Sequence, residues 1–144
     1  MDASARALVP DASFSMSLES GIGELLTATR LAWTIYRDCR AAPHRFQALS
    51  EEVEALHIVL DSIKTIVLDK GLDLSRTDDL NRVSRGCTTV LTELEALIAK
   101  YKTLGTKRKA WDRLRWGQED IDLLRRRLTS NVSLLTAFNS SLVQ

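Results

Sequence analysis

The sequence predicts an all-α fold: an antiparallel four-helix bundle with one short extra helix before the last long helix. Apolar residues recur at alternating spacings of three and four along four long stretches, which is typical of helices that share one core. The 144 residues include only six glycines and two prolines. That is too few for the turns of an all-β fold or the loops of a nucleotide-binding α/β fold. Apolar residues make up 44% and charged residues 27%, as in an ordinary single domain.

We expect residues 1–17 to form a flexible N-terminal tail and residues 18–142 to form the helical domain. The first helix is predicted over about 20–41, with Ser20 as its N-cap and its end before Pro43. Its expected core face consists of Ile22, Leu25, Leu26, Thr29, Ala32, Trp33 and Tyr36. Cys39, in the last turn, is expected to be partly exposed.

The second helix is predicted over about 43–70, because Pro43 suits the first turn of a helix. Its apolar residues keep a strict heptad spacing: Phe46, Leu49, Val53, Leu56, Leu60, Ile63 and Val67. Gly71 is expected to end this helix in a left-handed conformation.

The third helix is predicted over about 76–104 and is expected to end at Gly105. Ser75 and Asp78, which are close to a capping box, or Thr77 with Asp79 are its candidate start residues. Its expected core face is Leu80, Val83, Cys87, Val90, Leu94, Leu97 and Tyr101. Gly86 lies inside this helix at a cost of about 1 kcal/mol relative to alanine. We expect this glycine to permit the close approach of another helix.

A short helix over about 106–115 and a last long helix over about 118–142 are predicted, with Gly117 between them. The core face of the long helix is expected to be Ile121, Leu124, Leu128, Val132, Leu135, Phe138 and Leu142. On an unbroken helix, Trp111 and Trp116 would lie about 140° apart. A break near Gly117 would let both indoles close the end of the bundle. The competing interpretation is one continuous helix with Trp116 exposed as an interface anchor.

Nine side chains are expected to be the centre of the core: Leu56, Leu60, Ile63, Val83, Val90, Leu94, Leu124, Leu128 and Leu135.

Catalytic, cofactor and metal-binding residues are not indicated. The two histidines, His44 and His57, have no ligand partner at helical spacing, and Cys87 occupies a core position. No phosphate-binding, nucleophile-elbow or zinc-protease motif occurs. The sequence therefore predicts a protein that is not an enzyme and has no cofactor. Two helical thiols and the lack of a signal-like or membrane-spanning stretch suggest a cytoplasmic location.

Charge is segregated along the chain. Residues 50–99 hold ten acids and five bases, whereas residues 100–127 hold ten bases and four acids. The simpler interpretation is a solvated basic face that pairs with the acidic second and third helices. The alternative is a contact for anionic lipid, phosphate or an acidic partner. The candidate residues are Lys107, Arg108, Lys109, Arg113, Arg115, Arg125, Arg126 and Arg127. A net charge of +1 disfavours nucleic acid as the partner.

The last 17 residues, 128–144, carry no charge, and nine of them are Ser, Thr, Asn or Gln. One interpretation is a central bundle helix whose hydroxyls bond back to its own carbonyls. The other is a self-associating or membrane-active surface.

Several residue strings resemble a helical domain of filamentous fungi, which belongs to the HeLo-like group. The strings are Gly23-Glu24-Leu25-Leu26, Leu31-Ala32-Trp33, Leu56-His57, Leu94-Glu95-Ala96-Leu97, Lys100-Tyr101, Leu134-Leu135-Thr136-Ala137-Phe138 and, most specific of all, Trp111-Asp112-Arg113-Leu114-Arg115-Trp116-Gly117. The resemblance covers about residues 18–142. The wider group is similar to the helical bundles of plant helper immune receptors and of mixed-lineage kinase domain-like protein.

The resemblance implies an N-terminal signalling or effector module of a fungal NLR-like receptor with a NACHT or NB-ARC domain, or of an ankyrin-repeat protein. Such a module would act by self-association or by binding other helical domains. Nucleotide would be bound only by a domain outside these 144 residues. The alternative implied by the group is a regulated cell-death effector that oligomerises on anionic membranes after activation. Here residues 1–17 are less continuously apolar than the N-termini of the membrane-active members.

Overall fold

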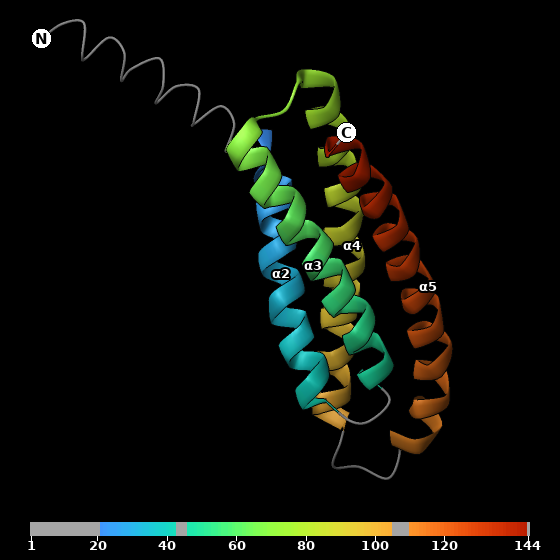
Figure 1. Cartoon of the computed structure of the whole chain (residues 1–144). Coiled ribbons are helices and arrows are strands. Elements are labelled where there is room, and N and C mark those ends of the chain that lie inside the picture. The colour runs from blue at the N-terminus through green and yellow to red at the C-terminus, as the bar shows by residue number, and fades with distance from the viewer. Residues whose placement is uncertain (1–20, 43–45, 105–109, 144) are drawn as a thin grey trace, which may run out of the picture.

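The computed structural model describes residues 21–42, 46–104 and 110–143, without the side chains of 103–118. Over these ranges the chain is almost entirely helical and contains no strand, so the predicted all-α class is confirmed. Four helices form the bundle (Figure 1): α2 over Gly23–Ala41, α3 over Gln47–Lys70, α4 over Leu74–Leu104 and α5 over Ala110–Leu142.

Each helix packs against two others. α2 lies against α3 and α4, and α5 also lies against α3 and α4, so α2 and α5 occupy opposite corners of the bundle. The chain reverses direction at each connection (Figure 1). α3 and α4 follow each other in the chain but lie diagonally across the bundle. Two of the pairs that pack side by side, α2/α4 and α3/α5, therefore run parallel. The predicted antiparallel course, which followed from the short connections, holds for each pair of consecutive helices.

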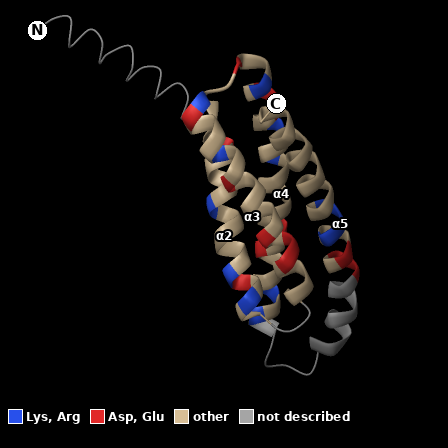
Figure 2. Cartoon of the chain, in the orientation of Figure 1, with Lys and Arg blue, Asp and Glu red and all other residues tan. Residues whose placement is uncertain are grey.

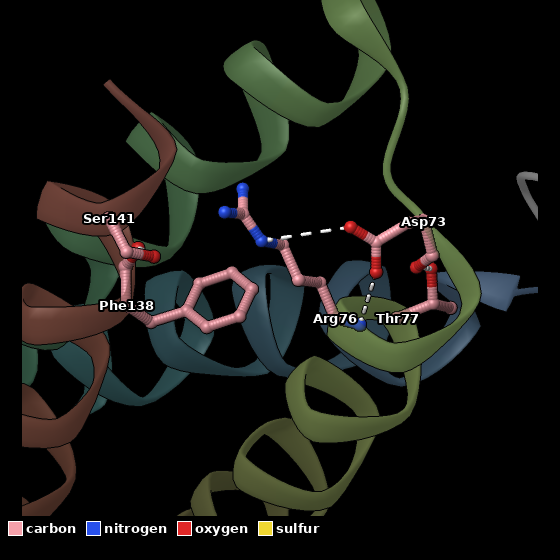
Figure 3. Close-up of polar contacts among 5 residues, drawn as sticks. All are labelled: Asp73, Arg76, Thr77, Phe138 and Ser141. Atoms are coloured by element: carbon pink, nitrogen blue, oxygen red, sulfur yellow. Dashed lines mark hydrogen bonds and ion pairs between the residues drawn. The ribbon is translucent and has the colours of Figure 1, made fainter. Parts of the chain in front are cut away.

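The connection between α3 and α4 is set by two residues. Gly71 has a φ of 74°, as expected for a helix-ending glycine, and its N–H donates to the Val67 carbonyl at 2.8 Å. Asp73 caps α4, because its carboxylate accepts a 2.8 Å hydrogen bond from the Arg76 N–H (Figure 3). The Asp73 carbonyl also accepts from Thr77. The predicted Ser75 and Asp78 box is wrong, because α4 begins at Leu74, before it.

Some predicted features lie outside the described residues, namely the tail 1–17, the caps Ser20 and Gly105, and Pro43. α2 begins after Ile22 and α3 after Phe46, and neither of these N-cap residues makes a side-chain capping hydrogen bond.

α5 is one continuous helix that passes through Gly117. The separate helix predicted over 106–115 and the break near Gly117 are therefore wrong for residues 110–118. One helical glycine costs only about 1 kcal/mol, which the packing of a 33-residue helix can offset.

The strict heptad of α3 is confirmed, since all seven of its predicted residues are buried. Eight of the nine side chains predicted for the centre of the core are also buried. The exception is Val83, which is partly buried and packs against the core from its edge. Its neighbour Ser84 lies inside instead.

The predicted inner faces of α2 and α4 are confirmed in part. The buried residues that were predicted are Ile22, Leu25, Thr29 and Ala32 for α2 and Leu80, Cys87, Val90 and Leu94 for α4. The remaining positions differ. On α2, Ala28, Ile35 and Cys39 are buried, whereas Trp33 is 48% exposed and Tyr36 is partly buried. Cys39, expected to be partly exposed, is fully buried. On α4, Leu91 and Ile98 are buried, and their neighbours Leu97 and Tyr101 only partly so.

Gly86 is not required by the approach of α5. A Cβ atom built at this position would meet only Asn131 Oδ1 of α5, at 3.9 Å, which is an ordinary contact. The expectation of a close helix approach at Gly86 is therefore wrong.

Candidate interaction surfaces

Two of the three arginines at 125–127 are engaged by carboxylates of neighbouring helices. Arg125 Nε lies 3.9 Å from Glu52 of α3, and Arg127 forms an ion pair with Glu93 of α4. Arg126 is exposed and makes no ion pair with any residue whose side chain is described. In Figure 2, basic and acidic positions follow each other along α5. This part of α5 is therefore largely a charge-paired face.

The remaining basic candidates, Lys107, Arg108, Lys109, Arg113 and Arg115, lie outside the residues whose side chains the structure describes. The same holds for the interface candidates Trp111 and Trp116. Because α5 is continuous there, these two tryptophan positions are about 140° apart around its axis.

The outer face of α5 beyond Leu128 is exposed and uncharged. At helical spacing it presents Ser130, Leu134, Ala137 and Ser141, and Leu134 is 56% exposed. The interpretation of a central helix is therefore wrong for this face, although the inner face of α5 is buried at Leu128 and Leu135. Because these residues are exposed, burial does not explain why they are uncharged.

Three hydroxyls of this segment, those of Thr129, Thr136 and Ser141, bond back to its own backbone, as one of the two interpretations predicted. Thr136 donates to the Val132 carbonyl at 2.7 Å and Ser141 to the Phe138 carbonyl at 2.6 Å. Figure 3 shows Ser141 and Phe138 near the start of α4. Because these hydroxyls already have an intrahelical acceptor, they add little polarity to the surface.

A groove of about 300 Å³ lies between α4 and α5. Apolar atoms dominate its floor, which includes Leu97 and Leu124, and Leu123 stands at its edge, 49% exposed. Its charged lining residues are Glu93, Lys100, Asp120 and Arg127. Leu123 lies on the same outer side of α5 as Leu134, since eleven residues turn a helix by about 1100°, three turns and 20°.

A second exposed surface lies on α2. Arg30, Trp33, Arg37 and Arg40 are all exposed and follow each other at spacings of three, four and three, which places them along one face. Arg30 and Arg37 have no ion pair with any residue whose side chain the structure describes. Sequence analysis missed this surface because Trp33 was assigned to the core. The spacing of the three arginines was the available signal.

Trp33 is held by two neighbouring rings. Its ring centroid lies 5.7 Å from that of Tyr36 and 5.3 Å from that of His57 on α3. Tyr36 is fixed in turn by Arg40, whose Nη1 donates to the Tyr36 hydroxyl at 3.0 Å. His57 thus acts as a packing residue beside a surface tryptophan.

The thiols are poor nucleophiles. Burial, with a smaller contribution from the Asp38 carboxylate, raises the pKa of Cys39 to about 12. Burial raises the pKa of Cys87 to about 12 as well. A thiol with such a pKa is protonated at neutral pH and unreactive.

The described residues include no cluster of three or more His, Cys, Asp or Glu side chains that could hold a metal ion. None of the helices, over the same part of the chain, combines the length and apolar character needed to cross a membrane. Comparisons with protein-family models, curated proteins and solved structures find no match to this chain.

Proposed function

We propose that this chain is a helical interaction module that self-associates through the outer face of α5. The observation that carries the proposal is the exposed, uncharged stripe of Ser130, Leu134, Ala137 and Ser141 on a helix whose inner face is already buried. An exposed helix face without any charge is unusual for a surface that meets only water.

A second copy of the chain is a suitable partner for this stripe. In a two-fold symmetric contact the same surface of both copies forms the interface. A face with charge of one sign would therefore meet charge of the same sign on the other copy. The stripe carries no charge and avoids that repulsion. The small side chains at 130, 137 and 141 let a second helix axis approach closely, and Leu134 supplies an apolar anchor.

This function agrees with what the resemblance to HeLo-like domains implies, namely a signalling module of an NLR-like receptor that acts through helix-mediated association. Arg125 and Arg127 add no support to the membrane-acting alternative, because both already have carboxylate partners. The proposal therefore concerns protein association.

The test is sedimentation equilibrium of the chain and two matched variants. Leu134→Glu places a charge on the stripe, whereas Ile58→Glu makes the same kind of change on α3 at a side chain that is 59% exposed. We expect the unmodified chain and Ile58→Glu to self-associate equally, and Leu134→Glu to associate at least about 30-fold more weakly. A monomer at all concentrations, or equal effects of the two variants, would contradict the proposal.

A further inference from the structure

The exposed face of α2 has a composition different from that of α5, and it points to a different partner. It presents three guanidinium groups, at Arg30, Arg37 and Arg40, around the half-exposed indole of Trp33. Tryptophan, tyrosine and arginine are the residues that most often dominate the binding energy of protein interfaces. We infer that this face of α2 binds an acidic, helical segment of a partner protein.

Preorganisation supports this assignment. The Trp33 ring has two ring neighbours, with centroids at 5.7 Å for Tyr36 and 5.3 Å for His57. Arg40 is placed by its hydrogen bond to the Tyr36 hydroxyl and by its position 5.8 Å from the centre of that ring. Side chains that are ordered before binding lose less conformational entropy when the partner arrives. The aromatic centre of the surface is therefore already in place.

Charge complementarity determines the kind of partner. Arg30 and Arg37 are seven positions apart, on the same side of α2, and neither has a carboxylate partner among the described side chains. From Arg30 to Arg40 the surface extends about 15 Å, or nearly three helical turns. A partner helix with carboxylates seven positions apart and an apolar residue between them matches both guanidiniums and the indole.

A membrane surface fits less well. A helix that lies on a bilayer needs a broad apolar face, and the apolar face of α2 is turned into the core at Leu25 and Ile35. Trp33 is the exposed large apolar side chain of α2. Glu51 and Glu54 share a surface pocket with Arg40, which leaves Arg30 and Arg37 as the cations of this face without a described carboxylate partner. Two such cations are few for an extended polyphosphate such as nucleic acid, which usually needs many phosphate contacts.

The experiment uses a synthetic helical peptide of about 15 residues with two glutamates seven positions apart and a leucine between them. The control peptide has glutamine at both glutamate positions. Binding to the unmodified chain is measured by calorimetry at about 50 and about 200 mM salt. In a Trp111→Phe/Trp116→Phe variant, the emission of Trp33 provides a second measurement. We expect saturable, salt-sensitive binding of the acidic peptide and a blue shift of Trp33 emission.

Two protein variants with the same change of net charge separate this surface from general electrostatics. Arg30→Gln/Arg37→Gln is expected to weaken binding of the acidic peptide about three- to tenfold. Arg82→Gln/Arg126→Gln, on other helices, is expected to leave it nearly unchanged. Equal loss in both variants, or no binding of the acidic peptide at millimolar concentration, would overturn the inference.

Phosphatidylcholine vesicles with and without phosphatidylglycerol, and a single-stranded oligonucleotide, are tested on the same proteins. If binding of the vesicles or of the oligonucleotide is weakened more by Arg30→Gln/Arg37→Gln than binding of the acidic peptide is, the inference is overturned. The surface is then a site for that ligand. The Arg30→Gln/Arg37→Gln variant leaves α5 unaltered, because both substitutions lie on α2. Self-association measured on this variant therefore tests the proposed function separately.

Discussion

α2 and α5 lie at opposite corners of one bundle, and each buries an apolar face against α3 and α4. Their outer faces differ. That of α2 carries Arg30, Trp33, Arg37 and Arg40, whereas the exposed part of α5 beyond Leu128 carries no charge. The difference teaches that the core determines only the inner side of each helix. The outer sides are free to be specialised, and we propose that they serve different partners.

The largest expected effect concerns the inner side of α5. Leu135 is fully buried and Leu134, its neighbour, is 56% exposed. Leu135→Ala should lower the free energy of unfolding by about 2–5 kcal/mol because it leaves a cavity in the core. Leu134→Ala should change it by less than about 1 kcal/mol. Urea unfolding of the two variants measures both values. Equal losses would show that the division of α5 into an inner and an outer face is wrong.

The two buried thiols, Cys39 on the inner face of α2 and Cys87 on α4, make the stability of the protein depend on pH. The pKa values of Cys39 and Cys87 are raised to about 12 from an ordinary value of 9.0, so the unfolded chain ionises first as pH rises. The unfolded state then binds fewer protons than the folded state, and stability must fall between pH 9 and 12.

At about pH 10 the expected loss is about 1.4 kcal/mol for each thiol, which urea unfolding at about pH 8 and pH 10 can measure. The control is Cys39→Ala/Cys87→Ala, whose stability should depend less on pH over this interval. An equally steep dependence in the control would assign the effect to other groups.

The ion pair between Arg127 and Glu93 separates the charged half of α5 from its uncharged half. Because both side chains are partly exposed, their coupling should be about 0.2–1 kcal/mol. A double-mutant cycle with Arg127→Gln and Glu93→Gln measures it in low and high salt. Arg126→Gln, which breaks no described ion pair, should have no measurable effect on stability. A large loss in Arg126→Gln would show that this side chain has a structural role.

A stabilising effect is expected at Gly86 on α4, opposite Asn131 of α5. A Cβ atom added at Gly86 would lie 3.9 Å from Asn131 Oδ1, which is an ordinary van der Waals contact. Because alanine favours a helix more than glycine does, Gly86→Ala should stabilise the protein by up to about 1 kcal/mol. Thermal unfolding measures the change. Destabilisation would mean that α4 and α5 lie closer together than the structure has them.

Sequence analysis predicted the all-α fold. It also predicted the inner face of α3, because the apolar residues of this helix fit only one heptad alignment. On α2 and α4, apolar residues stand next to each other, as at Ala32 and Trp33 or at Leu97 and Ile98. Either neighbour can define the inner face, and the two choices differ by about 100°. Tertiary packing decides between them. Trp33 was wrongly included in the core face beside Ala32, whereas the buried Ile35 was left out.

The outer faces were predicted only in part. The uncharged segment 128–144 was recognised, since the absence of charge is visible in the sequence. The partners of Arg125 and Arg127 could not be assigned individually, because they come from helices about 73 and 34 positions earlier in the chain and depend on the diagonal placement of α3 and α4. The aromatic support of Trp33 by His57 likewise depends on the packing of α2 against α3.

The most direct test of the central claim is the concentration dependence of amide chemical shifts in the unmodified chain. The proposed association predicts that dilution changes the shifts of residues on the outer face of α5, centred on Leu134, and leaves those around Arg30 and Trp33 unchanged. Changes centred on α2, or no change over the range in which the chain is measured to associate, would contradict the assignment of self-association to α5.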